Sequence, residues 1–90
     1  SIHKLTADKD TRYGLGIALS HFLPEGGAEM SASPRERAYF LLCGSMVVRG
    51  ETEEYFLEPG DLIYISPDEK REIRVTGTEP ATILVIVVAK

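Results

Sequence analysis

Apolar and polar side chains alternate along this chain in short segments, and strict alternation is typical of a β-strand, whose successive side chains point to opposite faces. The first such segment runs from Leu15 to Leu23. One face carries Leu15, Ile17, Leu19, His21 and Leu23, and the other carries Gly16, Ala18, Ser20 and Phe22. Because the first set is rich in leucine and isoleucine, we expect it to point inward and to take His21 with it.

Further segments of the same kind follow at intervals of roughly 8 to 12 residues, with glycine and proline between them. They are residues 37–43, 46–49, 53–57, 62–65, 71–75 and 81–89. By contrast, residues 28–34 are small and polar without periodicity, so we expect a loop after the break at 24–27. No segment shows the helical period of about 3.6 residues. The pattern predicts an all-β barrel or sandwich.

Two segments, residues 37–43 and 81–89, are apolar on both faces. In residues 37–43, one face carries Arg37, Tyr39, Leu41 and Cys43, and the other carries Ala38, Phe40 and Leu42. A strand of this kind has the interior on one side and a second sheet or a subunit on the other. We therefore expect a homodimer in which Phe40, Leu42 and part of residues 82–88 are covered by the partner.

Length and charge restrict the class of protein. Ninety residues suit one domain, which we divide into an N-terminal arm (1–14) and a barrel domain (15–90). With a net charge of −4 and scattered Lys and Arg, we expect no nucleic-acid partner. The longest apolar run, 81–89, is about half of the roughly 20 residues that a membrane span needs, so we expect no membrane partner. A single cysteine and the absence of a leader pattern favour the cytoplasm.

Two motifs indicate a family. The first comprises Pro24-Glu25-Gly26-Gly27 and the strand that ends at Gly44, and the second is Gly60-Asp61-Leu62-Ile63-Tyr64-Ile65-Ser66-Pro67. Fifteen residues separate Gly44 from Gly60. Over about residues 15 to 88 the chain resembles the cupin family. The resemblance implies a small β-barrel of the double-stranded β-helix or jelly-roll type.

The same resemblance shows where a cupin metal site would lie. Cupin motifs carry His-x-His and Glu in the first motif and His in the second, and these side chains hold a metal. Here the corresponding positions are Ser31, Ser33, Arg37 and Arg71. A serine hydroxyl is a poor ligand at neutral pH and a guanidinium has no lone pair to offer. We therefore expect no metal and no cofactor.

Arg37 and Arg71 share their predicted inward faces with apolar side chains, which would place two cations in the barrel. Two guanidinium groups about 6 Å apart repel by about 3 kcal/mol at an effective dielectric constant of about 20. We predict that Arg37, Arg71, Tyr39 and His21 bind a small anionic ligand, a carboxylate or a phosphate. The alternatives are an internal carboxylate such as Glu29, or arginine stems that extend outward to solvent.

Three functions remain open. The first is a metal-free cupin-type protein that binds a small molecule. The second is a small enzyme, an isomerase, lyase or hydrolase, that would use His21, a tyrosine and the arginines on a small carboxylate. The third is a structural dimerisation module. We further interpret Cys43 as a buried small hydrophobe, Tyr64 as a core or interface residue and Asp61 as a turn residue.

Overall fold

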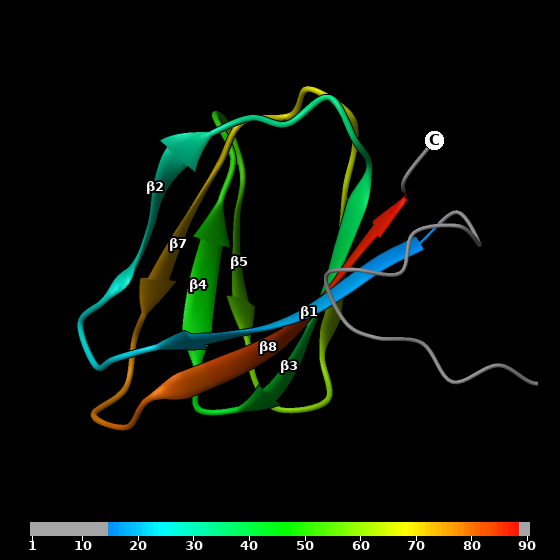
Figure 1. Cartoon of the computed structure of the whole chain (residues 1–90). Coiled ribbons are helices and arrows are strands. Elements are labelled where there is room, and N and C mark those ends of the chain that lie inside the picture. The colour runs from blue at the N-terminus through cyan, green and yellow to red at the C-terminus, as the bar shows by residue number, and fades with distance from the viewer. Residues whose placement is uncertain (1–14, 89–90) are drawn as a thin grey trace, which may run out of the picture.

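A computed structural model describes residues 15–88, which form two four-stranded antiparallel sheets that lie face to face (Figure 1). Sheet A has the strand order β1 (Leu15–Phe22), β8 (Ala81–Val88), β3 (Arg37–Cys43) and β6 (Leu62–Ile65). Sheet B has the order β2 (Gly27–Ser31), β7 (Arg71–Val75), β4 (Met46–Arg49) and β5 (Glu54–Leu57). The predicted all-β fold of the double-stranded β-helix type is confirmed. The predicted arm, residues 1–14, lies outside the described residues.

The chain passes from one sheet to the other at almost every connection, and only β4 and β5 are consecutive strands of one sheet. These two form a hairpin, in which Met46 pairs with Leu57 and Arg49 with Glu54. The backbone amide of Gly50 donates to the carbonyl oxygen of Glu53 at 2.9 Å and closes the turn. Repeated crossing brings residues that are distant in sequence to facing positions across one interior.

The core lies between the two sheets. It contains Tyr39, Leu41, Met46, Val48, Leu57, Ile65, Ile73, Val75, Ala81 and Ile83. The predicted inward faces of residues 37–41 and 71–75 are confirmed, because alternate residues of β3 and β7 are buried. Arg37 and Arg71 share these faces at the first position of their strands, which sets them at the boundary of the apolar core.

Residues 27–31 form β2 and not the predicted loop. Gly27 pairs with Arg74 and Ser31 with Arg71, and the register shifts between Ala28 and Ser31. An edge strand that is mostly exposed and irregular has no alternation to detect in the sequence. The backbones also approach closely here, since a Cβ atom on Gly27 would lie 1.9 Å from the carbonyl oxygen of Ile73. Glycine is required for this contact.

Two other predictions of side-chain direction were wrong. In β1, Leu19 and His21 are exposed and Phe22 packs against the core, so the assignment of the two faces is reversed. In β3, a register shift between Leu41 and Cys43 ends the alternation and leaves Cys43 exposed. Sequence alternation alone does not identify the buried face of an edge strand whose more apolar side faces outward, and it cannot detect a bulge.

The longest apolar run forms the predicted strand, β8, which lies between β1 and β3 in sheet A. The part of the chain that the structure describes contains no helix of the length and apolar character needed to cross a membrane. The interpretation of Asp61 as a turn residue is confirmed in the turn before β6. There, the carboxylate of Asp61 accepts a hydrogen bond from the backbone amide of Glu58 at 2.8 Å.

Candidate functional site

Three side chains from the two sheets meet in the interior: Arg37 and Tyr39 of β3 and Arg71 of β7, which we call the arginine–tyrosine cluster. Arg37 and Tyr39 are two residues apart on a strand and therefore share a face. Arg37 Nη1 donates to Tyr39 Oη at 3.2 Å. From the opposite sheet, Arg71 Nε donates to the same oxygen at 2.8 Å. The structure thus brings together three of the four residues that the sequence nominated.

Arg37 is buried, with only 7% of its surface exposed. Its Nε and Nη2 atoms are shielded from solvent and have no hydrogen-bond partner. These two N–H groups form one edge of the planar guanidinium, and such an edge fits the two oxygens of a carboxylate or phosphate. Each buried polar group left without a partner costs about 1 to 3 kcal/mol, and more if it is charged. Arg37 therefore presents an unused anion-binding edge.

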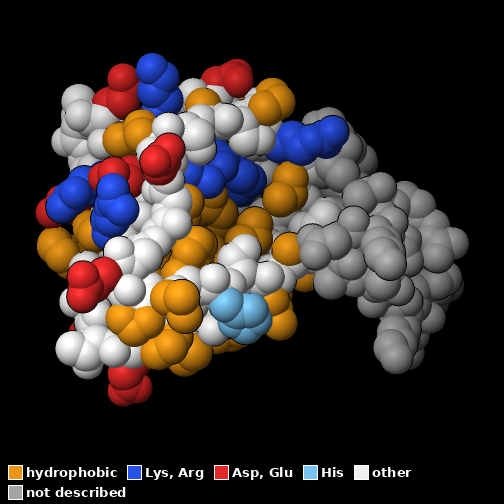
Figure 2. Space-filling view, turned by 60° about the vertical axis from the view of Figure 1, so that its left-hand side comes forward, with side chains coloured by type: hydrophobic (Ala, Val, Ile, Leu, Met, Phe, Trp, Pro, Cys, Tyr) orange, Lys and Arg blue, Asp and Glu red, His pale blue; other side chains and the backbone are white. Residues whose placement is uncertain are grey.

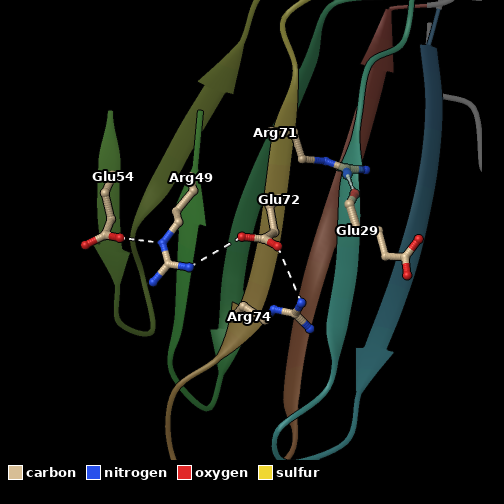
Figure 3. Close-up of polar contacts among 6 residues, drawn as sticks. All are labelled: Glu29, Arg49, Glu54, Arg71, Glu72 and Arg74. Atoms are coloured by element: carbon tan, nitrogen blue, oxygen red, sulfur yellow. Dashed lines mark hydrogen bonds and ion pairs between the residues drawn. The ribbon is translucent and has the colours of Figure 1, made fainter. Parts of the chain in front are cut away.

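Arg71 is only partly buried and is held by uncharged groups. Its Nη1 donates to the backbone carbonyl oxygen of Glu29 at 3.1 Å and to Ser31 Oγ at 3.0 Å. Its guanidinium carbon lies 5.9 Å from the centre of the Tyr39 ring, within cation–π range. Figure 3 shows the carboxylate of Glu29 directed away from Arg71. Glu29 therefore contributes a backbone dipole to Arg71 and not the neutralising charge considered above.

The carboxylates that neighbour the cluster arginines in sequence are engaged elsewhere. Glu36 accepts a hydrogen bond from Tyr64 Oη, and Glu72 pairs with Arg49 and Arg74. A further ion pair joins Arg49 to Glu54 (Figure 3). Among residues 15–88, the ion pairs found do not include either cluster arginine.

The two guanidinium groups of the cluster therefore repel each other. Their donor nitrogens lie 3.2 Å and 2.8 Å from the same oxygen. For two unit charges about 6 Å apart, the repulsion is about 3 kcal/mol at an effective dielectric constant of about 20.

The phenol oxygen of Tyr39 has a defined role in this geometry. A phenol carries two acceptor lone pairs and one donor proton. The two arginines occupy the acceptor positions. Within the described residues, the Tyr39 proton therefore remains available for a third oxygen atom.

A metal of the kind that the cupin resemblance implies does not fit these side chains. Of the four corresponding positions, Ser31, Arg37 and Arg71 belong to the cluster or contact it, and Ser33 Oγ instead accepts the backbone amide of Arg35 at 3.3 Å. Guanidinium groups have no lone pair for a metal. Within the described part of the chain, no group of three or more His, Cys, Asp and Glu could hold a metal ion.

His21 does not join the cluster. Its strand partner is Thr82, and the imidazole Nδ1 lies 2.9 Å from Thr82 Oγ1. Thr82 alternates with the buried residues Ala81 and Ile83, so this contact is on the outer face of sheet A. The expectation that His21 points into the barrel was wrong, because the buried face of β1 is the one that carries Phe22.

A cleft of about 570 Å³ opens between the edge strands β5 and β6, and Arg71 contributes to its lining. Its apolar lining combines the core residues Val48, Leu57 and Ile65 and the adjoining Ile63 with exposed side chains at the rim: Tyr55, Phe56, Leu62 and Tyr64. The charged residues that line it are of both signs, Lys70 and Arg71 against Glu53, Asp61 and Glu69. On the β2 side, Figure 2 shows basic side chains within a hollow whose lower part is hydrophobic.

Sequence reasoning did not identify Ser31 and the Glu29 carbonyl oxygen as partners of Arg71. Both lie on β2, where the register shift hides the pairing of Ser31 with Arg71. The one available signal was the position of Ser31 in the first motif, which sequence reasoning used only to argue against a metal.

The sequence matches the cupin domain family over residues 18–87. The fold is similar to that of a protein from Thermus thermophilus, with 25% identity, a TM-score of 0.76 and coverage of 82% of this chain and 71% of that one. A cupin-like protein from Thermotoga maritima has 15% identity and a TM-score of 0.83, with coverage of 94% of this chain and 65% of that one. A cupin superfamily protein from Desulfitobacterium hafniense has 18% identity and a TM-score of 0.76, with coverage of 84% of this chain and 68% of that one. Among curated proteins, none matches the sequence.

Proposed function

This chain belongs to the cupin family, and we propose that it is a metal-free member that binds a small oxyanion, a carboxylate or a phosphate, at Arg37, Tyr39 and Arg71. The observation that carries the proposal is the unpartnered edge of Arg37 beside a second arginine. A buried cation with two free donors is costly unless an acceptor reaches it. An oxyanion supplies that acceptor and neutralises the repulsion between the two arginines.

The ligand would reach the cluster through Arg71. This residue is half-buried and borders the cleft between β5 and β6, whereas Arg37 Nε and Nη2 are shielded from solvent. Binding at Arg37 therefore requires the side chains that cover its edge to move. The cleft volume of about 570 Å³ lies in the range of small-molecule sites, about 300 to 1,000 Å³. Its apolar residues suit a carboxylate with an apolar body.

The enzyme alternative required His21 beside the arginines. In the structure His21 contacts Thr82 on the outer face of sheet A, away from the inward-facing cluster. Without that group, the geometry supports binding of an anion more directly than its conversion.

The test is a thermal-shift titration with inorganic phosphate, acetate and benzoate. Arg71→Ala removes one cluster charge. Arg74→Ala is the matched control, because Arg74 lies on the same strand with its side chain 49% exposed at the outer ion pairs. A ligand at 100 times its dissociation constant should stabilise the wild-type protein by about 2.7 kcal/mol. We expect the same gain in Arg74→Ala and a much smaller gain in Arg71→Ala.

Benzoate should bind more tightly than acetate if its ring enters the cleft. The proposal is wrong if none of the three anions stabilises the wild-type protein. It is also wrong if Arg71→Ala and Arg74→Ala respond alike, since the effect would then come from net charge alone.

A further inference from the structure

The exposed aromatic side chains gather at the mouth of the cleft between β5 and β6. Among residues 15–88, the aromatic side chains that are more than half exposed are Tyr55, Phe56 and Tyr64, and all three line this cleft. The exposed large apolar side chains that do not line it are all aliphatic: Leu19, Leu23, Met30 and Leu42. Scattered leucines are ordinary on a protein surface, whereas aromatic side chains are typical of ligand pockets. The cleft is therefore set apart from the rest of the surface by its rings.

Tyr55 forms one wall of the cleft, on the inner side of sheet B. It pairs with the core residue Val48, and paired residues of neighbouring strands share a face, so its ring projects toward the interior. Its hydroxyl donates to Glu53 Oε2 at 2.8 Å, which holds the ring toward the turn between β4 and β5. This hydrogen bond is also the main reason that the pKa of Tyr55 is raised above its ordinary value. The wall is therefore a fixed, uncharged ring.

The opposite wall is aliphatic and lies beside the arginine–tyrosine cluster. On β6, Ile63 pairs with Tyr39 and Ile65 pairs with Arg37, so both isoleucines share the inward face of the two cluster residues. Both isoleucines also line the cleft. A ligand that enters between β5 and β6 therefore lies between an aromatic and an aliphatic wall, next to the cluster.

Gly50 lies at the end of the cleft, beside Arg71. The last pair of the β4–β7 ladder is Arg49 with Glu72, and the next positions on the two strands are Gly50 and Arg71. Opposed Cα atoms of antiparallel strands are about 5 Å apart. Both residues line the cleft. A side chain at position 50 would therefore project beside the stem of Arg71 and take up part of the cleft.

The backbone does not require a glycine at position 50. Its φ lies outside the left-handed region that Gly44 and Gly60 occupy. Among the described residues, an added Cβ atom would have one contact within 4 Å, the carbonyl oxygen of Lys70 at 3.8 Å, which is an ordinary van der Waals distance. Since neither conformation nor close packing requires this glycine, its effect is to leave space in the cleft next to Arg71.

We propose that the ligand of this site is an aromatic carboxylate, whose ring lies between Tyr55 and Ile63 and passes over Gly50. The inference rests on the proposed function, because the arginine–tyrosine cluster holds the carboxylate. A flat ring fits between two facing walls, and a ring in contact with Tyr55 gains attraction beyond that of its buried area. A saturated acid gains only the burial of its apolar surface.

The first test compares two acids with the same number of carbon atoms, benzoate and cyclohexanecarboxylate, by thermal-shift titration. The saturated ring is thicker and more apolar, so burial alone favours cyclohexanecarboxylate, whereas contact with Tyr55 favours benzoate. We expect benzoate to bind the wild-type protein more tightly by about 2- to 12-fold. In Tyr55→Leu, which keeps an apolar wall without a ring, this preference should disappear.

The second test adds a side chain where Gly50 leaves room. Gly50→Leu should weaken benzoate binding by at least about tenfold and acetate binding by less than about threefold, because acetate has no ring to accommodate. Thr52→Leu is the matched control, because Thr52 is exposed in the same turn and does not line the cleft. It should bind both acids as the wild-type protein does. Circular dichroism verifies that each variant is folded.

The outcomes separate this inference from the proposed function. If acetate and benzoate stabilise the wild-type protein but benzoate is not preferred to cyclohexanecarboxylate, the ring site is wrong and the anion site is unaffected. The same holds if a folded Gly50→Leu binds benzoate as Thr52→Leu does, or weakens both acids alike. If Gly50→Leu does not fold, the comparison of the two acids in Tyr55→Leu decides. If no acid stabilises the wild-type protein, the proposed function is wrong and this inference with it.

Discussion

Among the described residues, Arg37 is the one charged side chain that is buried in this barrel. Its side chain is buried and, among residues 15–88, has a single hydrogen-bond acceptor, the phenol oxygen that it shares with Arg71. An arginine cannot lose its proton to escape such a site. Its cost must therefore be offset by the packing of its stem, by the shared phenol and, on our proposal, by a bound anion.

The shared acceptor can be tested by Tyr39→Phe, which keeps the buried ring and removes only the oxygen. Because two guanidinium N–H groups then lose their partner, we expect unfolding free energy to fall by about 1 to 3 kcal/mol in urea denaturation. Tyr55→Phe is the control, since Tyr55 is exposed and its hydroxyl donates to Glu53, and its effect should stay within about 0.5 kcal/mol. Equal effects of the two changes would show that the phenol of Tyr39 does not stabilise the arginines.

The alternation of apolar and polar residues in the sequence correctly predicted which way the three cluster side chains point. Alternation holds on β3 and β7 because each has one face against the apolar core, so Arg37, Tyr39 and Arg71 could be assigned to the interior. It failed for His21, because the more apolar side of the edge strand β1 faces outward, and for Cys43, because a bulge shifts the register. Whether the cluster binds an anion stays a prediction.

Among the elements, the turn from β3 to β4 depends on a single glycine. Gly44 joins β3 of sheet A to β4 of sheet B with a φ of +83°, where side chains with a Cβ are strained. A Cβ atom there would also lie 2.6 Å from the carbonyl oxygen of Pro80 and 2.7 Å from Cα of Ala81. The sequence indicated that a strand ends at Gly44, but the close approach to Pro80 and Ala81 depends on the fold and could not be predicted from the sequence.

We expect Gly44→Ala to lower the free energy of unfolding by more than about 2 kcal/mol, because it combines a left-handed backbone with two backbone clashes. Two control variants separate these causes. Gly60→Ala has a φ of +96° and open space around the new atom, and should cost about 1 to 2 kcal/mol. Gly50→Ala has its nearest contact at 3.8 Å and should change stability by less than about 1 kcal/mol. Chemical denaturation measures all three, and equal losses would contradict the clash.

For the whole molecule, the sequence predicted the barrel and the apolar character of residues 37–43 and 81–89, but not the arrangement of the outer faces. Leu19, Leu84, Phe40 and Leu62 come from four separate segments, and only the strand register shows that they form one row. The exposed side of β1 was assigned to the interior for the same reason. The contrast between an apolar sheet A and a charged sheet B is thus a property of the assembled fold.

The homodimer expected from the sequence, if it forms through the outer face of sheet A, would make thermal stability depend on protein concentration, because mass action favours the associated folded state. A tenfold increase in concentration adds about 1.4 kcal/mol per dimer. For two chains of this length that gain should raise the unfolding midpoint by about 4 °C. Differential scanning calorimetry of the wild-type protein and of Phe56→Lys, a change on sheet B, should show this shift, while Leu19→Lys/Leu62→Lys, which places charges on the outer face of sheet A, should unfold at one temperature at all concentrations. A wild-type midpoint that does not change with concentration would contradict coupling between folding and dimerisation.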